Sequence, residues 1–454
     1  MGNKNRCGRA GGLFCRSAAC FAAELCACMI SCGASACYAK TCALRALNAY
    51  GIKYAEVYTS LSRIVLCIDR SEAICRRVSA VVYDYALLEK CLGILCLCEG
   101  GASVSHAEKM LSAAVRHKRS VCSQISGGGL ACASFCAFFK GGPAETLVCL
   151  VVNLLISAMS ALLPRNGAGA ARLFFLSLFG GAISLLLCSS AFMLGVDCCA
   201  EYVIAGGIMT SVPGLKLCAA LRDGFSGEFT CCAQRLFACF AELAALSLGY
   251  VLAGALFSFL PLPHFWARRS EFTARLLFCG MGVTGFCLFM NVRPERIFQC
   301  LPSALAAYSI YSLALPLGMH ASGFLAAAAA HVSARVLSRV FGAPQDVFLT
   351  PALVPIVPGA QMFYAAEGLL NANFTRVLLY GADAIVFFAA IAAGLAAAAS
   401  AEKAVRALLF MCRRSFPRLR ARRSTLTVKP KKSVGSGACP VVRGGKFEGR
   451  QPKM

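Results

Sequence analysis

The chain has 454 residues, of which 58% are apolar (A, V, I, L, M, F, W, Y and C) and 15% are charged, and its net charge is +24. A typical soluble domain is about one quarter charged, so this chain lacks the polar surface that several soluble domains would need. The composition excludes a purely soluble protein and predicts a membrane protein. Half of the net charge lies in the last 42 residues, which argues against a nucleic-acid-binding protein.

The N-terminal 120 residues differ in composition from the rest, because charged residues occur there every few positions. We expect a small cytosolic α+β domain over residues 1–120. The pattern predicts a helix over 25–48, strands over 56–61, 63–69 and 77–83, and helices over 87–98 and 105–118. Ser105 with Glu108 has the spacing of a capping box at the start of the last helix.

From Cys122 onward, apolar runs are long enough to cross about 30 Å of hydrocarbon. We predict ten spans: 122–139, 146–163, 173–193, 199–213, 231–260, 272–291, 298–317, 321–341, 347–365 and 376–400. The fourth and ninth runs carry an internal Pro-Gly, so each can be a broken or re-entrant helix. Gly127–Gly129 and Gly180-Gly181 are predicted to be close-packing points between helices. The predicted fold is a mostly α, polytopic membrane protein with a small α+β domain.

The short loops predict the orientation, because Lys and Arg favour the cytoplasmic side. With the N-terminal domain inside, the predicted inner loops carry most of the basic residues, namely Arg165, Arg172, Lys216, Arg222, Arg293, Arg296, Arg335 and Arg339. Arg268 and Arg269 in one outer loop break the rule. We therefore expect a multi-pass protein of the cytoplasmic (inner) membrane with both termini in the cytoplasm.

The ten spans divide into two sets of five, which gives modules at 121–262 and 263–405. The sequence Ser211-Val212-Pro213-Gly214 in the fourth span is matched 145 residues later by Ile356-Val357-Pro358-Gly359 in the ninth. Phe229-Thr230 and Phe374-Thr375 are separated by the same distance. An odd number of spans in each module predicts inverted repeats. Matched helix breaks in such repeats are typical of secondary transporters, with the solute near the midplane.

Residues at the two breaks are the predicted binding residues, because broken helices free backbone groups that can bind a small polar solute. They are Ser211, Val212, Pro213, Gly214, Ile356, Val357, Pro358, Gly359 and Gln361, with Arg222 and Asp223 at the cytoplasmic rim. The alternatives are that the prolines only kink the helices, and that Arg222 and Asp223 form an exposed ion pair in a loop.

Ionisable residues inside spans are few, which makes them candidates for proton coupling. They are Glu242 in the fifth span, His331 in the eighth and Asp383 in the tenth. The alternatives are a neutral carboxylic acid, an ion pair between Glu242 and Arg235, and a histidine that is simply packed in the interior. The chain has no P-loop, no Gly-x-Ser-x-Gly and no His-Glu-x-x-His, so we expect neither an enzyme nor an ATP-driven pump.

The 29 cysteines contain no Cys-x-x-Cys pair, and the chain has only five histidines. We therefore expect the cysteines to act as small apolar residues in a reducing compartment, with no metal and no cofactor.

Four stretches resemble the threonine/serine exporter family, and together they cover about residues 20–405. They are Ser31–Ser35 with Ala49–Gly51, Gly207–Gly214 with Leu221–Asp223 and Ser226–Glu228, Phe289–Arg293, and Pro344–Tyr364. The resemblance implies a cytosolic α+β domain joined to two fused five-span modules, and proton-driven export of small amino acids such as threonine or serine. A two-chain relative resembles a succinate exporter, so a dicarboxylate is an alternative solute. An alternative function of a different class is that of a membrane-anchored sensor or scaffold.

The chain ends in a basic tail, in which thirteen Lys and Arg accompany one acid, Glu448, from Arg413 onward. We predict that residues 406–454 are a disordered cytoplasmic tail. Two roles for this tail are considered, namely docking on anionic lipid and a simple anchor that fixes the topology. The expected partners are a small polar solute and the lipid bilayer, and no nucleic acid is expected. The sequence leaves open whether the protein forms an oligomer.

Overall fold

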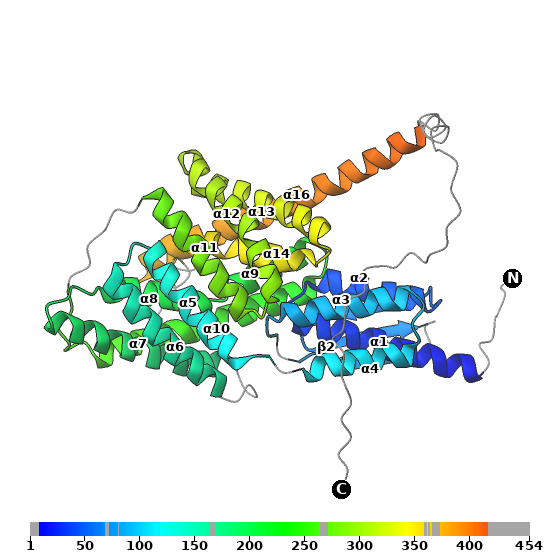
Figure 1. The fold of residues 1–454 in the computed structure, drawn as a ribbon, viewed down its shortest axis with the longest axis horizontal. Coiled ribbons are helices and arrows are strands. Elements are labelled where there is room, and N and C mark those ends of the chain that lie inside the picture. The colour runs from blue at the N-terminus through cyan, green and yellow to red at the C-terminus, as the bar shows by residue number, and fades with distance from the viewer. Residues whose placement is uncertain are drawn as a thin grey trace, which may run out of the picture. The chain divides into compact units, whose positions relative to one another are not determined.

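The computed structural model describes residues 9–68, 72–79, 81–117, 119–162, 169–263, 271–357, 361, 364–365 and 373–415. Residues up to Ser400 form one compact unit, and residues from Ala401 onward form a second. Figure 1 shows the helices and the small sheet of the first unit.

The N-terminal region, residues 9–120, combines four helices with a three-stranded sheet. Its elements are α1 (Arg9–Ser31), α2 (Ala36–Ala49), β1 (Ala55–Thr59), β2 (Arg63–Ile68), β3 (Glu72–Arg77), α3 (Tyr85–Glu99) and α4 (Val104–Arg116). The sheet is antiparallel in the order β1-β2-β3, with Val57 opposite Leu66 and Leu66 opposite Ile74. Helix α1 packs against the sheet and the other three helices, which bury Phe21, Leu25 and Met29 completely or nearly so.

Three details of this region differ from the sequence prediction. The predicted helix over 25–48 is two helices, because Gly33 turns the chain at φ +93° and Ser35 caps α2 by accepting from the Tyr38 N–H. The third strand lies at 72–77 rather than 77–83. The cap of α4 is Ser103, which accepts from the His106 N–H, so Ser105 lies inside the helix.

The remaining described helices account for the predicted spans. They are α5 (Val121–Phe138), α6 (Pro143–Leu162), α7 (Gly169–Met193), α8 (Ala200–Gly207), α9 (Gly214–Phe225), α10 (Phe229–Leu256), α11 (Phe272–Phe289), α12 (Pro294–Ala314), α13 (Met319–Phe341), α14 (Gln345–Leu353) and α16 (Phe374–Ser415). Three short 3-10 turns accompany them, at η1 (Ile208–Thr210), η2 (Leu315–Leu317) and η3 (Val354–Ile356). Helix α16 extends into the region predicted as tail, and residues 416–454 lie outside the described residues.

The protein is a polytopic membrane protein. Within the described residues, nine helices are long and apolar enough to cross a membrane, or ten if the bent pair around 211–213 counts as one span. Eight of the nine coincide with predicted spans, and the ninth is α1. Because the rest of the N-terminal region covers the apolar side chains of α1, this helix has a protein environment rather than a lipid-facing surface. The predicted span 347–365 is a short helix and a 3-10 turn before it leaves the described residues.

Glycines bring several spans into close contact, as the sequence predicted. A Cβ on Gly127 would overlap the backbone of Phe289 in α11, and one on Gly181 would overlap Ala253 in α10. Such contacts replace the hydrophobic driving force that is missing between helices in lipid. Large apolar side chains instead point outward along α10, where Phe237 is 78% exposed.

Two pairs of helices in the two halves begin at positions with the same spacing. Helices α8 and α14 start at Ala200 and Gln345, and α10 and α16 start at Phe229 and Phe374, so both pairs keep the spacing of 145 residues. Each short helix leads into one 3-10 turn, η1 or η3. Helix α8 packs against α5, α6 and α7, and α14 packs correspondingly against α11, α12 and α13. The starts of these two pairs and the neighbours of α8 and α14 thus repeat. The inversion of the halves remains a prediction.

Candidate functional site

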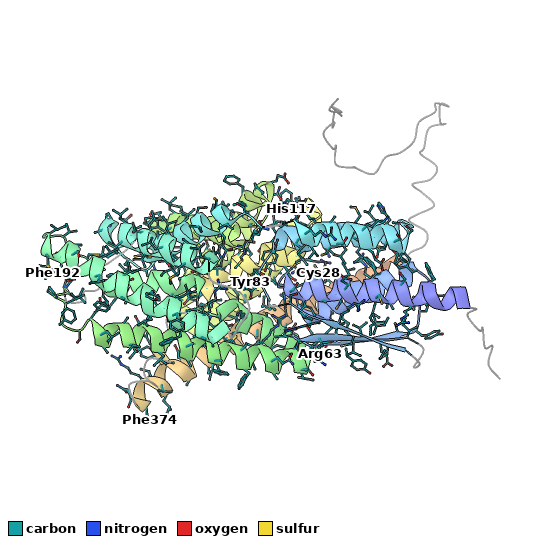
Figure 2. All side chains as sticks on the ribbon, turned by 90° about the horizontal axis from the view of Figure 1, so that it is seen from below. Cys28, Arg63, Tyr83, His117, Phe192 and Phe374 are labelled. Carbon is teal, nitrogen blue, oxygen red and sulfur yellow. The ribbon has the colours of Figure 1, made fainter. Side chains whose placement is uncertain are left out.

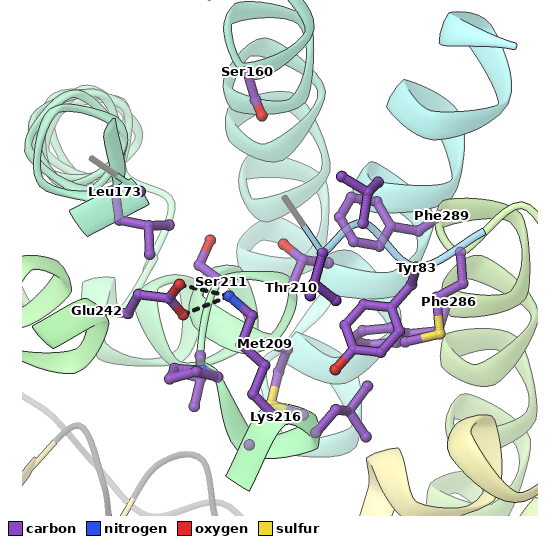
Figure 3. A pocket seen from close by; sticks show the side chains of 18 of the residues that line it. Tyr83, Ser160, Leu173, Met209, Thr210, Ser211, Lys216, Glu242, Phe286 and Phe289 are labelled. Carbon is purple, nitrogen blue, oxygen red and sulfur yellow. Dashed lines mark hydrogen bonds and ion pairs between the residues drawn. The ribbon is translucent and has the colours of Figure 1, made fainter. Parts of the chain in front are cut away.

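A cavity of about 550 Å³ lies where the first helix break meets the N-terminal region and α5, α6, α7, α9, α10 and α11. Its wall includes the whole predicted stretch from Ser211 to Gly214, together with Val357 and Glu242. Ile356 is buried close by, and Pro358 and Gly359 lie outside the described residues. Figure 3 shows the polar side chains that point into this cavity.

The first break exposes two helix ends to the cavity. The 3-10 turn η1 ends at Thr210, Pro213 cannot continue the helix, and α9 starts at Gly214 with a bend of 44° between the two segments. The first N–H groups of α9 have no acceptor within the helix, which makes this end partially positive. The carbonyl end of η1, at Met209 to Ser211, lines the same cavity and carries the opposite partial charge.

Val357, the first residue of the second Val-Pro-Gly segment, meets the first segment at this cavity. Gly214 of the first faces Val357 of the second so closely that a Cβ on Gly214 would overlap Cγ1 of Val357. Val357 is also held by its own N–H, which donates to the Leu353 carbonyl at 3.1 Å. Residues 143 positions apart therefore form one wall, although no local feature of the sequence requires the contact.

Lys216 and Glu242 form an ion pair inside the cavity. Lys216 Nζ lies 2.5 Å from Oε1 and 2.7 Å from Oε2 of Glu242. Their side chains are 29% and 14% exposed, respectively, so water screens the pair only in part. Glu242 thus has Lys216 as its partner, whereas Arg235, the partner considered from the sequence, binds Asp223.

Arg222 and Asp223 join neighbouring elements and do not line the cavity as the structure describes it. Arg222 Nη1 lies 2.7 Å from Asp346 Oδ1 at the start of α14. Asp223 is completely buried and accepts from Arg235 Nε at 3.0 Å and from the Ala36 N–H at 3.1 Å. These contacts tie α9 to the second half and to the N-terminal region.

The other predicted proton-coupling residues lie away from this cavity. Asp383 lines a second cavity of about 380 Å³, where His320 Nε2 is 3.1 Å from its Oδ1. His331 Nδ1 lies 3.3 Å from Gln345 Nε2. Gln361 contacts the sulfur of Met319 at 3.8 Å. By the repeat spacing of 145 residues, Asp383 corresponds to Ala238, which lines the first cavity and lies one helical turn before Glu242.

Several polar residues of the site could not be singled out from the sequence. Tyr83 comes from a stretch predicted as a strand of the soluble domain, and His320 lies at the end of a predicted outer loop. Arg172 of α7 donates to the carbonyl and hydroxyl oxygens of Ser160 on the cavity wall. Only the intramembrane position of Glu242 and the Pro-Gly breaks are visible as local patterns.

Among the residues that the structure describes, no group of three or more His, Cys, Asp or Glu side chains is arranged to hold a metal ion. Lys216, Glu242, the two helix ends and nearby hydroxyl groups can recognise a solute by charge and hydrogen bonds.

Comparisons with known proteins agree with this architecture. A family model described as a threonine/serine exporter matches residues 20–257, and a second, described as "Threonine/Serine exporter, ThrE", matches residues 275–401. A curated threonine/serine exporter of Corynebacterium glutamicum is 25% identical over 266 residues, which are 56% of this chain and 54% of that protein. The chain thus matches about half of the length of this relative. No solved structure matches the chain.

Proposed function

Because the chain belongs to the threonine/serine exporter family, we propose that it is a secondary transporter that exports small amino acids such as threonine or serine. The observation that carries this proposal is the cavity in which the first Val-Pro-Gly segment, Val357 of the second, a Lys–Glu pair and two helix ends converge. Such a cavity can bind a solute without transforming it, so the proposal does not include enzymatic activity.

The site suits a zwitterion because it presents both signs of charge. The N-terminal end of α9 and Lys216 attract a carboxylate, and Glu242 and the carbonyl end of η1 attract an ammonium group. A bound amino acid can replace each half of the Lys216–Glu242 pair by its own opposite charge. The electrostatic cost of opening the pair is then offset by the solute.

A dicarboxylate is the second candidate, because basic residues outnumber acids on the cavity wall. Arg119, Arg172, Lys216 and Arg235 line it together with one acid, Glu242. Asp223 pairs with Arg235. Two carboxylates would use the basic side chains of this wall better than one carboxylate and one ammonium group.

Counterflow in proteoliposomes decides between the two solutes. Vesicles that contain the purified protein and are loaded with unlabelled threonine, serine or succinate should accumulate the labelled form of a transported solute. We expect exchange of threonine and serine. Exchange of succinate alone would favour the dicarboxylate, and exchange of none of the three by folded protein would contradict both. A membrane-anchored sensor or scaffold would exchange none of the three solutes.

Replacing Gly214 by alanine is expected to slow threonine counterflow about tenfold or more, because the added methyl group overlaps Val357 and overpacking typically costs 1–3 kcal/mol. Val357→Ala in the same chain removes the overlapping Cγ1 and should restore most of the rate. Gly254→Ala in α10 is the matched control, since a Cβ there meets nothing within 4 Å. No rescue by the second substitution would mean that the two segments do not act together.

The repeat supports transport by alternating access. The first cavity is lined by the start of α7 and by α10, and the second by the start of α13 and by α16, which are the corresponding helices of the two halves. If the halves are inverted, the two cavities open toward opposite faces of the membrane. This arrangement would let one rocking motion close one cavity as the other opens.

We assign proton coupling to Asp383 with His320, in addition to Glu242. The pair lies 3.1 Å apart in the second cavity, and an ionisable pair at a membrane-spanning helix is a candidate for carrying a proton. Asp383→Asn is expected to reduce the acceleration of threonine transport by an imposed pH gradient about tenfold, while exchange at equal pH persists. An unchanged response to the gradient would remove Asp383 from the coupling path.

The contacts of the N-terminal region agree with the orientation derived from the loops. This region binds Glu228, Arg293 and Thr350 through Lys40, Glu89 and Tyr85, respectively. Glu228 and Arg293 are the residues directly before α10 and α12, and Thr350 lies within α14; the charge pattern assigns the starts of all three helices to the inner face. We therefore keep the proposal of a cytoplasmic N-terminal region in an inner-membrane protein. Protease protection in sealed inside-out vesicles tests it.

A further inference from the structure

The N-terminal region forms part of the cavity wall. Leu61, Val81, Val82 and Tyr83 all line the cavity, although they precede the first span of the bundle. Figure 2 shows Tyr83 where the N-terminal region adjoins the transmembrane helices. A soluble domain that only anchored or regulated the bundle would not need to reach the solute cavity.

Backbone contacts on both sides hold Tyr83 in place. The Val82 N–H donates to the Ser31 carbonyl at 2.8 Å, and the Tyr85 N–H donates to the Met290 carbonyl at 3.2 Å. The Tyr83 ring lies against Gly33, where a Cβ would come within 2.5 Å of its Cδ1. The side chain therefore has a fixed direction, which is the condition for specific recognition.

The hydroxyl group of Tyr83 is buried and has no hydrogen-bond partner among the described residues. Burial raises the pKa of this hydroxyl, with Arg235 acting in the opposite direction, so the group is protonated and can donate at neutral pH. A buried polar group without a partner costs about 1–3 kcal/mol and needs an explanation. A ligand in the adjoining cavity would supply the missing partner.

Tyr83 and the Lys216–Glu242 pair lie on opposite sides of the cavity (Figure 3). An amino acid whose charged groups bind the pair would therefore direct its side chain toward Tyr83. We propose that the Tyr83 hydroxyl hydrogen-bonds the side-chain hydroxyl of the solute, so that the N-terminal region selects hydroxy amino acids. This inference rests on the proposed transport of small amino acids.

Threonine and valine have nearly the same shape and differ by a hydroxyl group, so they isolate this hydrogen bond. In counterflow, Tyr83→Phe is expected to raise the KM for threonine about tenfold and to leave the KM for valine unchanged. Tyr54→Phe is the matched control, because Tyr54 lies in the same region but is 80% exposed. The melting temperature of Tyr83→Phe should equal or exceed that of the unaltered protein, because the hydroxyl makes no internal hydrogen bond.

The outcomes separate this inference from the transport proposal. An unaltered protein that exchanges threonine, combined with a Tyr83→Phe variant that keeps its threonine-over-valine preference, would overturn the role of Tyr83 alone. A lowered melting temperature with equal loss for both solutes would also overturn it, since that pattern indicates a structural role. An unaltered, folded protein that exchanges no amino acid would overturn the transport proposal together with this inference.

Discussion

Replacing Glu242 with glutamine is expected to reduce threonine counterflow roughly 30- to 100-fold, which corresponds to about 2–3 kcal/mol. The substitution leaves the charge of Lys216 without its partner in a cavity where the pair is only 14–29% exposed. It also removes the group that we assign to the solute ammonium. Breaking a fully buried pair costs about 3–5 kcal/mol, and the partial exposure of this pair reduces the expected loss.

A double variant separates binding from folding at this position. Lys216→Gln with Glu242→Gln contains no unpaired charge, so it should recover the melting temperature but not transport. Glu201→Gln on α8 is the control, because Glu201 is exposed and does not line the cavity as described. Wild-type counterflow by Glu242→Gln would show that the Lys–Glu pair has no part in solute binding.

Replacing Asp223 with asparagine is expected to destabilise the folded protein by about 3–5 kcal/mol and to lower its melting temperature by about 10 °C. Asp223 and Arg235 are 0% and 2% exposed, so the substitution leaves a charged guanidinium buried without a counter-ion. Thermal unfolding in detergent, followed by size-exclusion chromatography, measures the effect. Asp197→Asn, in an exposed loop, should leave the melting temperature unchanged.

The same substitution should loosen the N-terminal region. Asp223 accepts from the Ala36 N–H, and Arg235 Nη2 donates to the Ala34 carbonyl at 3.3 Å, so the ion pair also holds the turn between α1 and α2. Limited proteolysis of Asp223→Asn is expected to cleave this turn faster. Equal cleavage rates in both proteins would show that the ion pair does not hold the N-terminal region.

The membrane spans were predictable because each depends on a local property, the length of an apolar run. The first break was predictable for the same reason, since Pro213 with Gly214 disrupts a helix wherever it lies. The boundary between α1 and α2 was missed because Gly33 acts through a positive φ inside a continuous apolar pattern. The third strand was misplaced because alternation over Glu72–Arg77 is weak.

The site was predictable only in part, because its pairs connect distant segments. Glu242 stood out as an acid in a span, but its partner Lys216 is 26 residues away on another helix. Arg222 and Asp223 were expected at the solute and instead bind Asp346 and Arg235. Tyr83 had no distinguishing pattern, since its role depends on how the N-terminal region packs against the bundle.

A structure determined by electron cryomicroscopy in saturating threonine tests the central claim most directly. We predict density for one amino acid between the Lys216–Glu242 pair and Tyr83, beside the contact of Gly214 with Val357. Density that appears instead beside His320 and Asp383, with the first cavity empty, would contradict the assignment of the solute site.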